Sequence, residues 1–244
     1  MVHLVRTFDP RHLVLVALLS SGCGAARQHA KLQAEGEAMR VELAETYIDK
    51  GYGEAAIPLL RRALAANPKD VKVRVLYATV LRDLGLYPQA EAQFKVALKL
   101  SPRYAPAHAG LGILYDLQRE PKRALAHHRR AVKLAPGEAA YHNNLGFSLF
   151  VAGDTAGAIA ELELALGLDP ALIVAYNNLG FAYGRRGDYD RAERSFRTVG
   201  NRPAALLNMS LVYEDRGEGE RATELREEAY VLAPDLRPSE ELHE

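Results

Sequence analysis

The chain has 244 residues, of which 48% are hydrophobic and 25% are charged, and its 31 basic residues balance its 31 acidic residues. This composition is that of an ordinary globular protein. With no net charge there is no overall positive field to attract a phosphate backbone, so we predict no nucleic-acid partner.

Residues 1–22 have the pattern of an export signal. Arg6 and Arg11 precede the apolar run Leu13–Leu19, which is followed by small residues and Cys23. A helix of this run would be about 10 Å long, against about 30 Å for the hydrocarbon core of a bilayer. The run therefore predicts the apolar region of a signal peptide and not a membrane span. A buried N-terminal helix with a free cysteine is the alternative.

The stretch Leu19-Ser20-Ser21-Gly22-Cys23 resembles the lipobox of bacterial lipoproteins. In that family the cysteine is lipidated and the chain is cut just before it. Cys23 is the only cysteine in the sequence, so it has no disulfide partner within the chain. The resemblance implies a lipidated tether over residues 23–36. Because Gly24 is not the aspartate that retains lipoproteins at the inner membrane, it also implies attachment to the periplasmic face of the outer membrane; a periplasmic or inner-membrane-anchored protein is the alternative.

Four prolines recur at intervals of 34 residues, at Pro68, Pro102, Pro136 and Pro170. They end the similar segments "ALAANP", "ALKLSP", "AVKLAP" and "ALGLDP". Between successive prolines the apolar residues fall at helical spacing in two blocks that a turn separates. A fixed period of this length is typical of a solenoid built from repeated units. We therefore predict two helices in each period.

This pattern resembles the tetratricopeptide repeat, a pair of helices that stacks into a right-handed superhelix. Small residues recur where the family packs the two helices of a repeat closely, at Ala44, Ala56, Ala63, Ala78, Ala90, Ala97, Gly112, Ala124, Ala131, Gly146, Ala158, Ala165, Gly180, Ala192, Ser210, Ala222 and Ala229. The resemblance implies an all-α solenoid of about six repeats over residues 37–234. The boundaries are 37–70, 71–104, 105–138, 139–172, 173–202 and 203–236, followed by a tail at 237–244. Because no cluster of Pro or Gly interrupts the repeats, we expect one continuous domain.

The fifth repeat is shorter than the others. From Leu179 to its equivalent Met209 the distance is 30 residues and not 34, a difference of about one helical turn. We predict that the second helix of this repeat ends near Val199, with Gly200-Asn201 as its stop signal. In the last repeat Arg226 replaces an apolar residue, which suits a polar cap at the end of a solenoid.

No pattern in the sequence supports catalysis. The segment Gly110–Tyr115, "GLGILY", lacks the last glycine of a dinucleotide motif and does not follow a strand. His108 and His142 hold equivalent places in successive repeats, about 10 Å apart, whereas metal ligands lie about 2 Å from one ion. We expect these histidines, and His127-His128, to be partly exposed packing residues. We predict a non-enzyme with no metal, cofactor or small-molecule substrate.

The pentapeptide "NNLGF" occurs twice, at Asn143–Phe147 and Asn177–Phe181. In the family the first helix of each repeat lines a concave groove. The resemblance places there, as candidate peptide-binding residues, Ile113, Asn143, Asn144, Phe147, Phe150, Asn177, Asn178, Phe181, Asn208 and Leu211.

Within this set, Asn144, Asn178 and Asn208 stand where superhelical relatives carry an asparagine ladder that grips a peptide backbone. An amide suits this role because it offers both a donor and an acceptor. Two alternatives remain open. Asparagine is simply common at this place in the repeat, or the chain's own segment "RQHAKLQAEG" packs in the groove.

The short fifth repeat followed by "AALLNMSLVYEDRGE" resembles the tetratricopeptide lipoproteins of Flp-type (tight adherence, TadD-type) pilus systems. A lipoprotein with six repeats is also similar, less closely, to the pilotins of type IV pili. These resemblances imply a membrane-anchored scaffold that binds a secretin or another envelope subunit during pilus or secretion-system assembly. The alternative is an accessory peptide-binding module in envelope maintenance, serving cell-wall enzymes or outer-membrane protein assembly.

Overall fold

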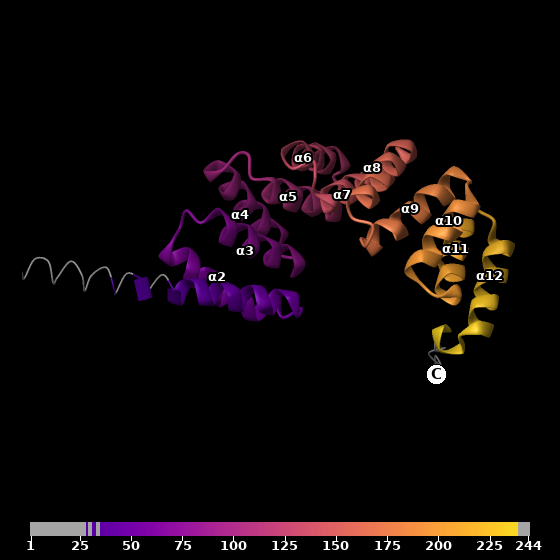
Figure 1. The fold of residues 1–244 in the computed structure, drawn as a ribbon, viewed down its shortest axis with the longest axis horizontal. Helices are drawn as coiled ribbons and strands as arrows, with labels where there is room; N and C mark the ends of the chain where they lie inside the picture. The colour runs from indigo at the N-terminus through magenta and orange to yellow at the C-terminus, as the bar shows by residue number, and fades with distance from the viewer. Residues whose placement is uncertain (1–27, 29–30, 33–34, 239–244) are drawn as a thin grey trace, which may run out of the picture. The chain divides into compact units, whose positions relative to one another are not determined.

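The structure is a computed structural model that describes residue 28, residues 31–32 and residues 35–238, and within them all regular structure is helical (Figure 1). The expected signal peptide, the lipidation at Cys23 and residues 239–244 of the tail lie outside the described residues. No helix in the described ranges is both long and apolar enough to cross a bilayer.

Contacts between Cα atoms divide the chain into two compact parts, Met1–Leu86 and Tyr87–Glu244. The boundary falls between the two helices of the second repeat, where the even spacing of the sequence predicted no division. The first part contains a helix over residues 35–49, α2 (Gly53–Ala66) and α3 (Val71–Asp83). Its buried cluster includes Ala44, Ala56, Leu60 and Val73.

The second part holds the remaining helices. They are α4 (Tyr87–Leu100), α5 (Ala105–Leu117), α6 (Pro121–Leu134), α7 (Ala139–Val151), α8 (Thr155–Leu168), α9 (Ile173–Arg186), α10 (Tyr189–Val199), α11 (Arg202–Asp215), α12 (Gly219–Leu232) and a 3-10 turn at Pro234–Leu236. From α5 onward the helices pack in consecutive pairs, one pair to a repeat, and the first helices α5, α7, α9 and α11 also contact one another in that order. The predicted all-α arrangement of helix pairs is confirmed.

The small residues predicted between the helices are buried, and three glycines show how close the helices come. A Cβ at Gly112 would lie 2.5 Å from the ring of His128, one at Gly146 would lie 2.7 Å from Leu162 Cγ, and one at Gly180 would lie 2.5 Å from Phe196 Cε1. Real Cβ atoms are almost never found so close to another heavy atom. The two helices of each of these repeats can therefore approach only because the side chain is missing.

The short fifth repeat ends as predicted. Helix α10 has 11 residues against 14 for α8, and its last residue is Val199. Asn201 has another role than the predicted stop signal, because its side chain accepts a hydrogen bond from Ala204 N at 3.0 Å and caps the start of α11. In the last repeat, Arg226 forms an ion pair with Glu214 at 3.1 Å.

Candidate functional site

The first helices of the second compact part carry equivalent residues in rows. One row, the apolar row, consists of Ile113, Phe147, Phe181 and Leu211, one each from α5, α7, α9 and α11. Three residues earlier on the same helices is the asparagine row, Asn144, Asn178 and Asn208, which has Gly110 at its α5 position. Residues three apart lie on one side of a helix, so the rows run side by side. We call the surface that they share the first-helix face.

The apolar row leaves large side chains in contact with solvent. Phe147 is 42% exposed and Leu211 is 50% exposed, while Ile113 and Phe181 are half-buried. The ring of Phe181 packs edge-on against Phe196, with 5.0 Å between the centroids. Apolar side chains exposed at equivalent positions of successive helices make this face a candidate binding surface.

The asparagines bond to one another across repeats. Asn178 Nδ2 donates to Asn143 Oδ1 at 2.9 Å, and Asn208 Nδ2 donates to Asn177 Oδ1 at 3.4 Å. In both cases a residue of the asparagine row donates to the first asparagine of the Asn-Asn pair in the previous repeat. Asn143 Nδ2 also donates to Asn144 Oδ1 at 3.3 Å. The amides therefore hold the first helices together.

Each residue of the asparagine row keeps one polar group open. Within the described residues, no hydrogen-bond partner faces Asn144 Nδ2, Asn178 Oδ1 or Asn208 Oδ1. These three atoms are not fully buried, so they contact solvent. The row thus offers an open donor on α7 and open acceptors on α9 and α11.

Two residues predicted for the groove belong to the framework behind the face. Asn143 is only 6% exposed. Phe150 is half-buried and packs against the buried clusters on either side of it. The guanidinium of Arg185 lies 3.6 Å above the Phe150 ring and donates to the Phe150 carbonyl at 2.8 Å. Arg185 was missed in the sequence, although it replaces Leu117 and Val151 of the preceding repeats.

Two of the four histidines contradict the prediction of partial exposure. His128 is 1% exposed and His142 is 3% exposed. His128 Nε2 lies 2.8 Å from Asp116 Oδ2, and Asp116 Oδ1 accepts a hydrogen bond from Ser148 Oγ at 2.9 Å. Helices α5, α6 and α7 are joined by this buried polar cluster. His142 Nε2 donates to the Pro136 carbonyl at 2.9 Å. Periodicity could not predict this burial, because it depends on polar partners from other helices.

His108 and His127 are half-buried, as predicted, and their Nδ1 atoms lie 3.0 Å apart. Burial lowers the pKa of His108; burial, then the neighbouring His108 and His128, lowers the pKa of His127 to about 4. His108 Nε2 donates to the Pro102 carbonyl at 3.2 Å, so its Nδ1 accepts from His127. Among the residues that the structure describes, no group of three or more His, Cys, Asp or Glu side chains is placed to hold a metal ion.

Comparison with known families gives the protein's class. A sequence model of the tetratricopeptide repeat matches residues 41–105 and 109–173, and a second model of the same repeat matches residues 172–199. The chain is a tetratricopeptide-repeat protein. No curated protein matches it.

Solved structures share the fold of this tetratricopeptide-repeat protein. PilF of Pseudomonas aeruginosa is 19% identical with a TM-score of 0.67, and the match covers 82% of this chain and 93% of PilF. PilW, a widely conserved type IV pilus biogenesis factor, is 20% identical with a TM-score of 0.69 over 81% of this chain and 94% of PilW. YrrB, a tetratricopeptide protein with an unusual peptide-binding site, is 23% identical with a TM-score of 0.57 over 72% and 93% of the two chains. At these identities the likeness shows the fold alone.

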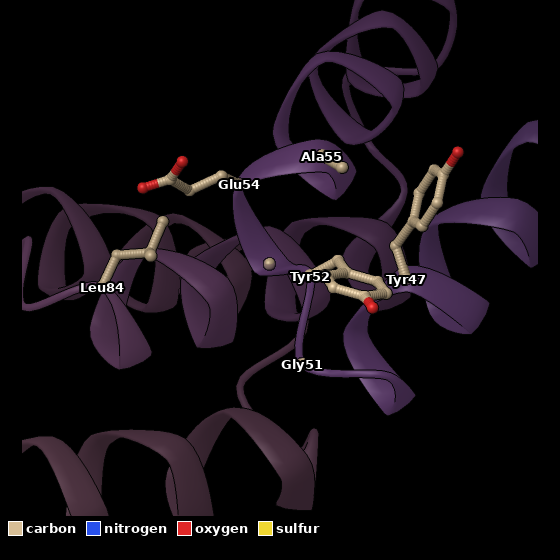
Figure 2. A pocket seen from close by; sticks show the side chains of 7 residues that line it. Tyr47, Gly51, Tyr52, Glu54, Ala55 and Leu84 are labelled. Carbon is tan, nitrogen blue, oxygen red and sulfur yellow. The ribbon is translucent and has the colours of Figure 1, made fainter.

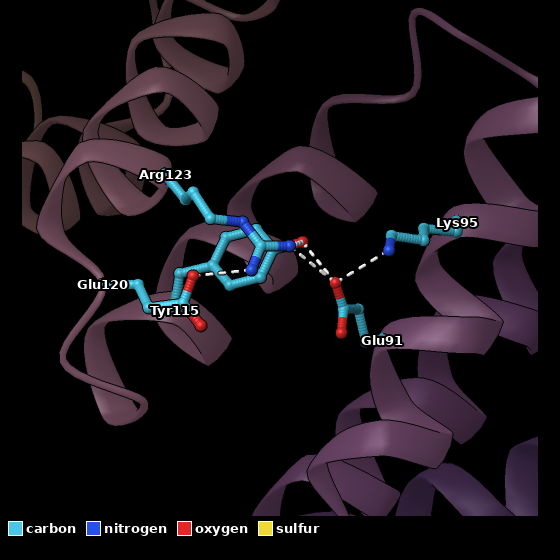
Figure 3. A network of polar contacts seen from close by, with 5 residues as sticks. All are labelled: Glu91, Lys95, Tyr115, Glu120 and Arg123. Atoms are coloured by element: carbon cyan, nitrogen blue, oxygen red, sulfur yellow. Dashed lines mark hydrogen bonds and ion pairs between the residues drawn. The ribbon is translucent and has the colours of Figure 1, made fainter.

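A network of charges joins α4, α5 and α6 of the tetratricopeptide protein (Figure 3). Glu91 Oε1 accepts from Tyr115 Oη and from Arg123 Nη2, each at 2.7 Å, and pairs with Lys95 at 2.8 Å. Lys95, and next Tyr115, lower the pKa of Glu91 to about 2. Burial, and next Glu91, raise the pKa of Tyr115 to about 12. Tyr115, Arg123 and Lys95 all bond to Glu91, so the network is a clamp between repeats.

In the part Met1–Leu86, a cavity of about 480 Å³ lies beside the turn that precedes α2 (Figure 2). The side chains that line it include two phenol rings, Tyr47 and Tyr52, with Leu84 and Glu54. One carboxylate among aromatic and aliphatic groups supports apolar contact and not acid–base chemistry. The first-helix face therefore remains the candidate functional site of the tetratricopeptide protein.

Proposed function

We propose that this tetratricopeptide protein is a scaffold that holds an extended segment of a second envelope protein on its first-helix face. The apolar row takes apolar side chains of the segment. The open amide atoms of the asparagine row bond its backbone. The observation that carries the proposal is this adjacency, in successive repeats, of exposed apolar side chains and unsatisfied amide groups.

The two rows divide the work of binding. A hydrogen bond from an amide to a peptide backbone is worth about 0.5–1.5 kcal/mol and does not depend on the side chains of the peptide. An aromatic side chain at the centre of an interface is often worth about 2 kcal/mol or more. The asparagine row therefore supplies general affinity, and Phe147 and Phe181 select the sequence that binds.

The partner that we propose is a subunit of a pilus or secretion machine, such as a secretin. The fold likeness to PilF and PilW supports this choice. So does the resemblance of the short fifth repeat to the lipoproteins of tight adherence pili. A partner from cell-wall synthesis or outer-membrane protein assembly is the alternative.

A lipid at Cys23 would place the scaffold on the periplasmic face of the outer membrane. This part of the proposal rests on the lipobox-like sequence alone. Each buried methylene contributes about 0.8 kcal/mol, so the acyl chains of a lipoprotein give a firm anchor. Metabolic labelling with a fatty acid should mark the protein, and Cys23→Ser should abolish the label and move the protein to the soluble fraction. Unlabelled wild-type protein would remove the anchor from the proposal.

Site-specific photo-crosslinking in the native membrane tests the scaffold itself. A photoreactive residue is placed in the full chain at Phe147, at Leu211, or at Leu164, which is 48% exposed but lies on the second helix α8. We expect Phe147 and Leu211 to give the same adduct and Leu164 to give none.

The identity of the adduct, read by mass spectrometry, decides between the partners. A pilus or secretion subunit supports the proposed machine, and a cell-wall or assembly factor supports the alternative. A crosslink to the chain's own segment "RQHAKLQAEG" would mean that the protein occupies its own face. No adduct from Phe147 and Leu211, or the same adduct from Leu164, would contradict the scaffold.

A further inference from the structure

The rows of the first-helix face repeat at the spacing of packed helices. Helices α5, α7, α9 and α11 contact one another in succession, and the bonds from Asn178 to Asn143 and from Asn208 to Asn177 join neighbouring first helices directly. Helices in direct contact lie about 8–10 Å apart. A bound segment therefore meets one apolar side chain and one amide about every 8–10 Å along the face.

The regular conformations of a peptide differ in how well they match this step. A β-strand rises about 3.3 Å per residue and returns to the same face every second residue, after about 6.6 Å. An α-helix returns after about 5.4 Å. A polyproline II helix rises about 3.1 Å with three residues per turn, so equivalent side chains recur after about 9.3 Å. Of the three, polyproline II fits the spacing of the rows.

Polyproline II also suits the asparagine row. This conformation has no internal hydrogen bonds, and its N–H and C=O groups remain available to a partner. Those groups recur on one side of the helix at the same step as its side chains. An open acceptor at Asn178 and another at Asn208 can therefore meet equivalent backbone N–H groups one turn apart.

The charges of the face set a second condition on the occupant. Helix α7 contains no Asp, Glu, Lys or Arg. The one charged residue of α5, Asp116, bonds to His128 and Ser148. Arg185 of α9 forms an ion pair with Asp215 of α11 at 3.5 Å. A charged side chain from a ligand would lose water here without gaining a free partner.

We infer that the segment held on the first-helix face is an uncharged polyproline II segment with an apolar residue at every third position. This inference rests on the proposed function and names the chemistry of its partner. One turn of the segment spans one repeat, so apolar residues on three successive turns would meet Phe147, Phe181 and Leu211 in order.

Synthetic peptides of about 12 residues test the spacing. One carries Leu at every third position in a Pro-rich uncharged background, and a second has the same composition, with the same number of Leu residues placed two positions apart. A third is the first peptide with Glu at two intervening positions. We measure their binding to the full chain, purified in detergent, by fluorescence anisotropy. We expect the first peptide to bind about tenfold more tightly than either of the others, because they lose an apolar contact or strand a charge.

Variants of the protein locate the binding. Phe147→Ala should lower the affinity for the first peptide about 30-fold. The matched control Leu164→Ala should leave this affinity unchanged. Far-UV circular dichroism of both variants checks that they are folded. Equal binding of the first and second peptides, or no binding of the first, would overturn the inference. The crosslinks from Phe147 and Leu211 report on the scaffold separately, because they require no particular conformation of the partner.

Discussion

Replacing Gly180 by alanine tests the close packing of the helix pairs. The new Cβ would lie 2.5, 2.7 and 2.8 Å from three ring carbons of Phe196, which is completely buried. Overpacking of this kind costs roughly 1–3 kcal/mol. Alanine also raises helix propensity by about 1 kcal/mol. With three short contacts the steric cost is at the upper end, so we expect a net loss of about 1–2 kcal/mol.

Gly167→Ala is the matched control for this change. Gly167 lies in the last turn of α8, and a Cβ there would meet no atom within 4 Å. Only the propensity gain applies, so this variant should be more stable than the wild type by about 0.5–1 kcal/mol. Urea unfolding measures both changes, and hydrogen exchange should show the damage of Gly180→Ala mainly in α9 and α10 and their neighbours. If Gly180→Ala stabilised the protein as the control does, the helices would be further apart than we describe.

Three further changes test the polar contacts. Glu91→Gln should lower the free energy of unfolding by about 1–2 kcal/mol at neutral pH, after allowance for solvent screening. Because folding lowers the pKa of Glu91 from 4.5 to about 2, the difference between wild type and variant should be full above pH 4.5 and should disappear as the pH falls to about 2. Urea titrations at several pH values measure this difference. The pKa of His127 is lowered from 6.5 to about 4, so the unfolded chain binds the proton first, and wild type should lose about 1–2 kcal/mol of stability as pH falls from 6.5 to about 4, after allowance for solvent screening of this half-buried ring; an equal slope in His127→Gln would argue against this origin. Asn178→Ala should lower the free energy of unfolding by about 1 kcal/mol, because it removes the hydrogen bond to Asn143. It should also weaken the binding of partner segments recovered by crosslinking, by the same factor for segments of different sequence. Unchanged binding would make this amide purely structural.

Periodicity predicted the helix pairs because small residues and prolines mark positions that depend only on the repeat itself. The 30-residue interval from Leu179 to Met209 likewise predicted the short helix α10, since a missing turn changes the count of residues directly. Exposure of Phe147 and Leu211 also follows from their places on the first helices.

Contacts that join different repeats could not be predicted in this way. The bond between Asn143 and Asn178 links residues 35 positions apart, one more than the period, so aligning the repeats does not pair them. The burial of His128 requires Asp116 from the preceding helix. The division after Leu86 leaves no mark in the composition, because no linker-like sequence accompanies it.

The direction of the asparagine hydrogen bonds affects where repeats can be added to the array. The second asparagine of a doublet donates backward and the first accepts from the following repeat, so a tandem copy of "NNLGF" brings both halves of a new joint with it. Before α7 the series cannot extend, since α5 has Ala109-Gly110 at these positions. After α11 it stops, because Leu207 replaces the accepting asparagine while Asn208 still donates to α9. Duplication of a repeat between α7 and α11 would therefore preserve the asparagine bonds, whereas a repeat added before α7 or after α11 would not be joined by them.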